Sequence, residues 1–286
     1  MPDSSSPPIT TSIVGLFKAG PGPSSSHTIA PMQAGLDFRA LLEALPEEKR
    51  RAAHNLRVRL FGSLSAPGEG HGNPKAVRTG LLGRKPADCP PHLPGGVLEL
   101  PPDERRVALL PNLAPLDRSV VVMDGIEHGH PYSNTMICEL LDQRGKVILD
   151  RTYYSVGGGF IQWEGWSAPE RGRQPFPFGS AAALRAHAEE NGLSIPHIMV
   201  SNETGLTGRS RVEIYRELDQ IIEIMRRSVL RGTGTEGMLP GTLGVYRKAA
   251  HLARKADSMD DPLNRFLGLL NAYAFAVSEE NAAGGI

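Results

Sequence analysis

Hydroxyl and imidazole groups are concentrated in one short segment near the start of the sequence, Pro23-Ser-Ser-Ser-His-Thr28. Apolar residues at helical spacing begin at Ile29, so the segment is expected at a helix N-terminus. Free backbone N–H groups and the helix dipole favour a carboxylate or a phosphate at such a position. Ordinary capping of the helix by a Ser or Thr hydroxyl is the alternative, and the pattern alone leaves both open.

Three further histidines are candidates for acid–base chemistry or metal binding. His71 lies between Gly70 and Gly72, where the backbone can approach a ligand closely and an imidazole can exchange protons near neutral pH. His128 and His130 form a His-x-His pair, which is a weak indication of a metal site without a carboxylate or a third ligand. Solvated loop histidines are the alternative for all three.

The number of cysteines and the balance of charges restrict the kinds of molecule that the protein is expected to bind. Cys89 and Cys138 lie far apart, which argues against a disulfide framework and against a zinc or iron–sulfur site made by this chain alone. Basic and acidic residues balance at 31 each, so no strong field recruits nucleic acid or an anionic membrane. Met1–Thr11 has no apolar signal core, and no apolar run approaches the roughly 20 residues that span a bilayer. We therefore expect a cytoplasmic protein with a small-molecule partner, binding neither nucleic acid nor membrane.

The elements that must position these groups are strands in the first part of the sequence. Alternating apolar and polar residues predict strands at Leu56–Leu60, Ser119–Met123, Thr135–Leu141 and Lys146–Val156. Residues 142–145 are typical of the hairpin turn between the last two. Prolines make residues 84–118 mostly irregular, with a possible short strand at 97–100.

The last part of the sequence predicts helices at residues 180–191, 210–230 and 262–283. Apolar residues follow one face of each of the last two helices. The predicted organisation is α+β: a disordered tail at 1–11, an α+β domain at 12–165, a linker at 166–179 and a helical domain at 180–286.

Five segments resemble, in the same order, motifs of the bacterial iron–sulfur L-serine dehydratases: Gly22-Pro-Ser-Ser-Ser-His-Thr28, Gly62-Ser-Leu64 with Gly68-Glu-Gly-His71, Tyr153-Tyr-Ser-Val-Gly-Gly-Gly-Phe-Ile161, Glu236-Gly-Met-Leu-Pro-Gly241 and Glu279-Glu-Asn-Ala-Ala-Gly-Gly285. The matches spread over nearly the whole chain. The resemblance implies an α+β domain, the serine dehydratase beta-chain type related to the allosteric substrate-binding domains of some phosphoglycerate dehydrogenases. An all-helical catalytic domain follows it in the family.

The resemblance also implies roles for single residues. The hydroxyl-rich loop lies at the family's active site, so substrate carboxylate binding is expected of Ser24, Ser25, Ser26, His27 and Thr28. His71 is the candidate base for the α-proton, and His27 is the second catalytic candidate. A [4Fe–4S] cluster on three cysteines leaves one iron open as a Lewis acid for the serine hydroxyl. Loss of a proton and hydroxide would give aminoacrylate, which hydrolyses to pyruvate and ammonia.

Two departures from the family pattern bear on the site. The family commonly has a His-x-Asn-Gly-Met type motif, whereas His130-Pro-Tyr-Ser-Asn134-Thr-Met136 has two extra residues between histidine and asparagine. His130 and Asn134 are kept as substrate-binding candidates. In the family, the three cluster cysteines come after the Glu-Asn-Ala-Ala-Gly-Gly segment, and neither Cys89 nor Cys138 matches them. No metal ligand is therefore assigned in this chain.

The leading interpretation is a fragment or shortened form of an L-serine dehydratase with an incomplete helical domain. One alternative is a subunit of a split dehydratase whose partner chain supplies the cysteines. Another is a non-catalytic ligand-binding or regulatory protein that has kept the first domain. The resemblance further implies L-serine as substrate and a homodimer.

Overall fold

The computed structural model of the chain describes residues 7–66, 72–90, 93–240 and 244–284. The chain divides into two compact units. The sheet unit contains Lys18–Trp166 together with Met225–Ile286, and the smaller unit contains the residues up to Phe17 together with Ser167–Ile224. The hydroxyl-rich segment and the predicted strands therefore belong to the sheet unit.

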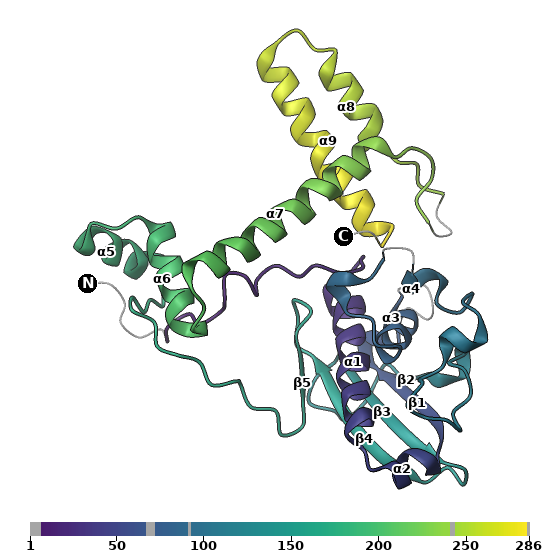
Figure 1. The fold of residues 1–286 in the computed structure, drawn as a ribbon. Coiled ribbons are helices and arrows are strands. Elements are labelled where there is room, and N and C mark those ends of the chain that lie inside the picture. Colours follow the sequence, from purple (N-terminus) through teal and green to yellow (C-terminus); the bar gives the residue numbers. More distant parts are fainter. Residues whose placement is uncertain (1–6, 67–71, 91–92, 241–243, 285–286) are drawn as a thin grey trace. The chain divides into compact units, whose positions relative to one another are not determined.

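The sheet has five strands in the order β2-β1-β3-β4-β5. Their bounds are β1 (Ala53–Phe61), β2 (Val121–Gly125), β3 (Thr135–Asp142), β4 (Val147–Ser155) and β5 (Ile161–Trp163). β1 and β2 are parallel, whereas the other neighbouring strands are antiparallel (Figure 1). The four predicted strands are confirmed, as is the α+β class, and β5 and the parallel pair extend the predicted sheet.

Alternation along β1 places every second side chain in the core. Leu56, Val58 and Leu60 are buried, because one face of the sheet is covered. Arg57 faces the other side, where its Nε lies 2.6 Å from Oε2 of Glu139 on β3. The apolar set therefore holds the sheet in one register, since a shift by one residue would bury the arginines.

Two helices pack together against the sheet, α1 (Ala30–Ala44) and α3 (Asn73–Leu81), as Figure 1 shows. They touch through glycines. A Cβ atom on Gly80 would lie 2.0 Å from the carbonyl oxygen of Met32, and one on Gly35 would lie 2.4 Å from that of Val77. The two helix backbones are thus in direct contact, and any larger side chain at either glycine would separate them.

Short helical turns fill the remainder of the sheet region. They are α2 (Glu47–Ala52), η2 (Gly62–Leu64), η4 (Pro86–Asp88), α4 (Leu93–Gly96), η5 (Pro102–Arg105) and η6 (Arg118–Val120). The possible strand at 97–100 is wrong: the N–H of Glu99 bonds to the carbonyl of Gly96 and closes a turn. Prolines directly after this turn prevent strand pairing.

The helices of the later part are α5 (Ala181–Asn191), α6 (Ile195–Thr207), α7 (Arg211–Gly234), α8 (Ala249–Asp257) and α9 (Pro262–Ala282). α5, α7 and α9 confirm the predicted helices, and α6 and α8 are additional. In the ranges that the structure describes, no helix is long and apolar enough to cross a membrane.

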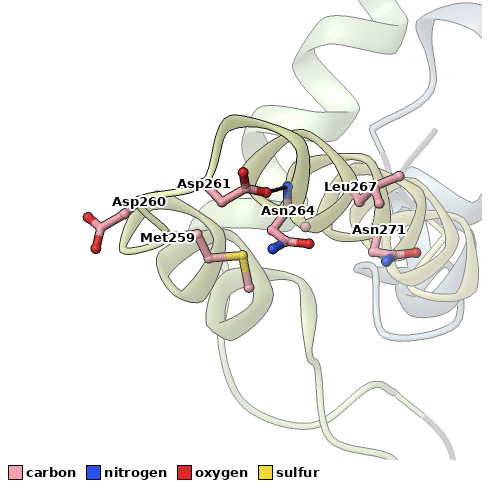
Figure 2. Close-up of a pocket in the computed structure, with 7 residues that line it drawn as sticks. Met259, Asp260, Asp261, Asn264, Leu267 and Asn271 are labelled. Atoms are coloured by element: carbon pink, nitrogen blue, oxygen red, sulfur yellow. Dashed lines mark hydrogen bonds between the residues drawn. The ribbon is translucent and has the colours of Figure 1, made fainter.

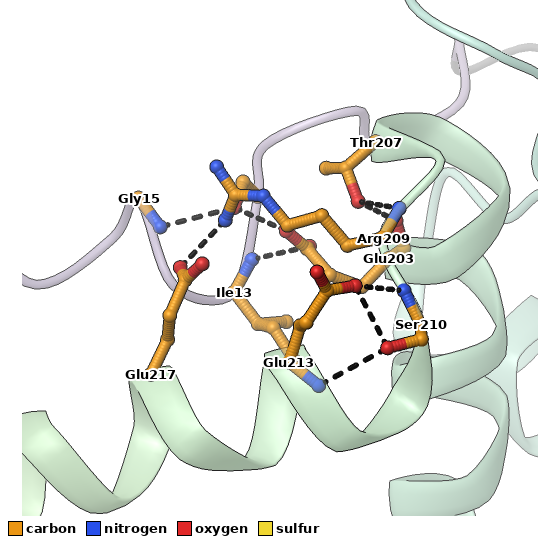
Figure 3. A network of polar contacts seen from close by, with 9 residues as sticks. Ile13, Gly15, Glu203, Thr207, Arg209, Ser210, Glu213 and Glu217 are labelled. Carbon is orange, nitrogen blue, oxygen red and sulfur yellow. Dashed lines mark hydrogen bonds and ion pairs between the residues drawn. The ribbon is translucent and has the colours of Figure 1, made fainter.

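Polar contacts attach two neighbouring segments of the smaller unit to α6, which also buries apolar side chains such as Ile198. The buried carboxylate of Glu203 accepts hydrogen bonds from the hydroxyl of Ser12 at 2.5 Å and from the N–H of Ile13 at 2.9 Å (Figure 3). The side-chain amide of Asn202 bonds to both backbone groups of Phe176, at 2.9 and 2.7 Å. Two segments without helix or strand are therefore attached to one helix by its side chains.

Large apolar side chains on α7 and α9 are exposed. They include Val212, Tyr215, Ile222, Met225, Leu263, Phe266, Leu267 and Leu270. The face of α9 that is buried carries small residues instead, Ala272 and Ala276. The apolar stripes predicted for these helices therefore face solvent in this chain, and they are suited to contact further protein.

Candidate active site

His27 lies in the middle of a series of hydrogen-bonded side chains, called here the His27 network. Its Nδ1 is 2.8 Å from Oγ of Ser26, and its Nε2 is 3.0 Å from Oγ of Ser63. Ser63 donates its hydroxyl proton to Oδ1 of Asn134. On the other side, Oγ of Ser24 lies 3.1 Å from Oγ of Ser26. The network thus brings together four of the residues singled out in the sequence.

The direction of the Ser63 hydroxyl determines which ring nitrogen of a neutral His27 carries the proton. Because Ser63 gives its proton to Asn134, its oxygen accepts from the Nε2–H of His27. Nδ1 is then the acceptor for the hydroxyl of Ser26. Imidazole and hydroxyl groups arranged in this way can pass a proton along the network.

Ser26 and His27 lie in the turn η1 (Ser25–Ile29), which directly precedes α1. Ser24 occupies the N-cap position but makes no side-chain capping hydrogen bond. Its hydroxyl faces Ser26 instead, so capping does not explain this serine. Ser155, at the end of β4, donates its hydroxyl to the carbonyl of Ser26 at 3.0 Å and so attaches the turn to the sheet.

Ser63 is a member of the network to which the sequence alone assigns no role. It follows Gly62, whose φ of +59° lies in the left-handed region. A Cβ atom there would lie 1.6 Å from the carbonyl oxygen of Ser133, so only glycine fits. The sharp turn at the end of β1 directs Ser63 toward His27. The sequence feature that points to Ser63 is a Gly-Ser pair directly after a predicted strand.

The other predicted site residues lie outside the network. His130 packs its ring against Phe61, with ring centroids 4.7 Å apart. Thr28 is 1% exposed, and its Oγ1 has no hydrogen-bond partner within the described ranges. The side chain of Ser25 makes no hydrogen bond to any other residue that the structure describes. His71 lies outside the described residues.

The last turn of α9 lies against the loop that leads into the hydroxyl-rich segment. A Cβ atom on Gly22 would lie 2.2 Å from the carbonyl oxygen of Asn281. The preceding residue, Glu280, is buried and pairs with Arg231 at 2.9 Å and with Arg247 at 2.8 Å. Two charged partners therefore fix the end of α9 close to the start of the site.

A separate hollow of about 440 Å³ lies where α8 passes into α9 (Figure 2). Asp261 caps α9 there by accepting a hydrogen bond from the N–H of Asn264 at 2.8 Å. Met259 and Leu267 supply apolar lining. The lining of this hollow shares no residue with the His27 network.

Comparison with known families accounts for both parts of this arrangement. A family described as serine dehydratase beta chain matches residues 12–166, and one described as serine dehydratase alpha chain matches residues 190–286. The chain belongs to the serine dehydratase family. The sheet and the His27 network lie in the beta-chain match, while α6 to α9 lie in the alpha-chain match.

Curated relatives of this serine dehydratase family member carry matching names. An L-serine dehydratase of Streptomyces coelicolor is 39% identical over 286 residues, covering 96% of this chain and 61% of the relative. L-serine dehydratase TdcG of Escherichia coli is 39% identical, covering 94% of this chain and 60% of the relative. An L-serine dehydratase of Haemophilus influenzae is 34% identical, with 96% and 61% covered. The chain thus spans about three fifths of the length of these serine dehydratases.

The two cysteines of this family member do not fit the iron–sulfur cluster that the resemblance implies. Cys138 points into the core from β3, and burial raises the pKa of its thiol far above the ordinary value. Partial burial also raises the pKa of the Cys89 thiol, to about 11. Such a cluster needs at least three thiolates, and within the described ranges no three His, Cys, Asp or Glu side chains are grouped for a metal.

Proposed function

We propose that the chain takes part in the conversion of L-serine into pyruvate and ammonia. In this reaction the substrate loses its α-proton and its hydroxide, and the aminoacrylate that remains is hydrolysed to pyruvate and ammonia. A catalyst must hold the carboxylate, accept the α-proton and assist the departure of hydroxide. Membership of the serine dehydratase family and the names of the relatives support this assignment.

The His27 network is the observation that carries the proposal for the site. It places three hydroxyls and an imidazole at the start of α1, where the helix dipole favours an anion. We assign the substrate carboxylate to this helix start, with the hydroxyls of Ser24, Ser25 and Thr28 and the backbone N–H of Ser26 as donors, because the Ser26 hydroxyl donates to His27. The buried Oγ1 of Thr28, which has no partner within the described ranges, supports the presence of a further hydrogen-bonding group.

Proton transfer is divided between two histidines in this proposal. His71 removes the α-proton, a role that rests on its Gly-His-Gly context in the sequence. His27 moves a proton between Ser26 and Ser63, because its two ring nitrogens contact both hydroxyls. Asn134 orients Ser63, and it and His130 complete the substrate side of the site.

The [4Fe–4S] cluster would supply a Lewis acid for the departing hydroxide when bound. Its cysteine ligands are not provided by the described residues of this chain. A homodimer and a cytoplasmic location complete the proposal. The exposed apolar faces of α7 and α9 support association with further protein.

The carboxylate assignment is tested by titrating the chain with L-serine and following backbone amide signals by NMR. Signals of residues 24–28 should shift with a Kd of about a millimolar, because an exposed helix end contributes only about 0.3–1 kcal/mol. Ser25→Ala should weaken binding about 2- to 10-fold, the usual effect of losing one hydrogen bond.

Ser258→Ala is the matched control, since this serine is exposed at the C-terminal end of α8 and its hydroxyl donates to the carbonyl of Lys255. It should bind serine as the unaltered chain does. The carboxylate assignment fails if no signal of residues 24–28 moves at high serine concentration. Equal binding by Ser25→Ala would remove that serine from the site.

A further inference from the structure

The last turn of α9 carries three polar side chains in a row, Glu279, Glu280 and Asn281. Glu279 is buried, and its Oε1 accepts hydrogen bonds at the start of α8, from the N–H of Lys248 at 2.5 Å and from that of Ala249 at 3.3 Å. Glu280 is also buried and makes its two ion pairs with arginines. Both carboxylates are therefore engaged within the protein, where they fix the end of α9.

Asn281 is the member of this turn whose side chain is not engaged in the same way. It is partly buried, and its amide makes no hydrogen bond to any residue that the structure describes. Its Nδ2 lies 3.0 Å from the point that a Cβ atom on Gly22 would occupy. Gly22 precedes Ser24 by two residues, and α9 and this loop belong to the same compact unit. An amide without a partner therefore lies at the start of the hydroxyl-rich segment.

An amino acid brings a second charged group to the site besides its carboxylate. The α-ammonium has three N–H donors and needs acceptors, whereas the carboxylate site at residues 24–28 supplies donors. In the His27 network, Oδ1 of Asn134 already accepts from the hydroxyl of Ser63. Nδ1 of His27 already accepts from the hydroxyl of Ser26. Oδ1 of Asn281 has no donor within the described ranges and is the amide oxygen left for the ammonium.

We infer that Asn281 binds the α-ammonium group of L-serine through its Oδ1 and thereby selects amino acids over acids that lack this group. The inference rests on the proposed function, which puts the substrate carboxylate at residues 24–28. Carboxylate and ammonium are bonded to the same carbon, so the acceptor has to lie beside the carboxylate donors, as Asn281 does through its contact with Gly22. A site built around such a hydrogen bond discriminates against a ligand that leaves the polar group unpaired. Glu279 and Glu280 act as positioning residues for Asn281.

The test is an NMR titration of the full chain with L-serine and with 3-hydroxypropanoate, which has the same carboxylate and hydroxyl but no ammonium. L-serine should shift the side-chain amide signals of Asn281 together with the backbone signals of residues 24–28. Asn281→Leu should weaken L-serine binding about tenfold, as expected for the loss of a hydrogen bond to a charged group. The same variant should leave the binding of 3-hydroxypropanoate unchanged. Asn281→Asp keeps an acceptor oxygen and should bind L-serine at least as tightly as the unaltered chain.

Asn271→Leu is the matched control, because Asn271 is an exposed asparagine on the same helix. It should bind both ligands as the unaltered chain does, and thermal unfolding checks that each variant is folded. The inference is overturned, and the carboxylate assignment stands, if L-serine shifts residues 24–28 but Asn281→Leu binds it as well as Asn271→Leu does. Equal weakening of both ligands by Asn281→Leu would also overturn it. If L-serine shifts no signal of residues 24–28 in the unaltered chain, the carboxylate assignment fails and the role of Asn281 fails with it.

Discussion

Each of the two compact units has buried apolar side chains, but buried polar side chains attach irregular segments in the smaller unit. In the sheet unit, one continuous cluster of buried apolar side chains extends from α1 and α3 across β1, β3 and β4. In the smaller unit, buried polar side chains of α6 attach neighbouring segments, as Glu203 and Asn202 do. Apolar packing is spread over many contacts, whereas a polar attachment depends on a few hydrogen bonds.

The difference indicates where each unit is vulnerable. Loss of volume in the cluster should affect the whole sheet unit, because its residues unfold together. Loss of a single acceptor in the smaller unit should release one segment and leave the helices in place.

The largest effect is expected from Phe38→Ala. Phe38 on α1 is fully buried in the apolar cluster, so its truncation leaves a cavity and should lower the free energy of unfolding by about 3–5 kcal/mol. Urea denaturation followed by circular dichroism measures this change. Phe266→Ala is the matched control, because Phe266 on α9 is 62% exposed and should change stability by less than about 0.5 kcal/mol. A similar loss of unfolding free energy in both variants would contradict the assignment of Phe38 as buried and Phe266 as exposed.

An intermediate effect is expected from Glu203→Ala. The N–H of Ile13 loses its acceptor, so its hydrogen exchange should accelerate about 5- to 150-fold, which corresponds to about 1–3 kcal/mol. Amide exchange followed by NMR reports this residue directly. Glu190→Ala on α5 removes an exposed carboxylate and should leave the exchange of Ile13 unchanged. Unaltered protection of Ile13 in Glu203→Ala would show that this attachment is not what holds the segment.

The smallest effect concerns Cys89, which lies in a loop of the otherwise well-packed sheet unit. Partial burial raises its thiol pKa to about 11, so its labelling rate should rise with pH to a midpoint near 11 instead of near the ordinary value. A raised thiol pKa favours the protonated folded state, so its contribution to stability is complete below the ordinary pKa and declines as the pH rises toward 11. Cys138 should react only after unfolding. A labelling midpoint below 9 for Cys89 would contradict partial burial.

Much of the sheet follows from the sequence, because alternation is a local signal. Leu56, Val58 and Leu60 predict β1 without knowledge of its neighbours. The parallel pairing of β1 with β2 is not predictable in this way, since the described residues between them contain no helix longer than α3. α6 escapes prediction because Pro196 and Gly205 lie inside it: the proline occupies its first turn, and the glycine allows close contact with the segment at Gly172.

The residue types of the candidate site were predictable from the sequence. The hydrogen bonds that link them were not. The cluster of Ser24, Ser26 and His27 is visible as a run of residue types. The link through Ser63 to Asn134 is not, because it depends on the turn at Gly62 and on strand pairing across the sheet. Distances between separate loops are set by tertiary packing, which one sequence does not display.

The contact between Gly35 and Gly80 sets a limit on how this site can be redesigned. The turn ahead of α1 carries Ser26 and His27 of the network, and the two helices meet backbone to backbone. A larger side chain at either glycine would therefore force the two helices apart. Libraries that repack the core around fixed glycines should keep the site geometry, whereas a single methyl group at either glycine would displace one helix start relative to the other. In protein engineering, both glycines should therefore be kept, because they allow the close contact between α1 and α3.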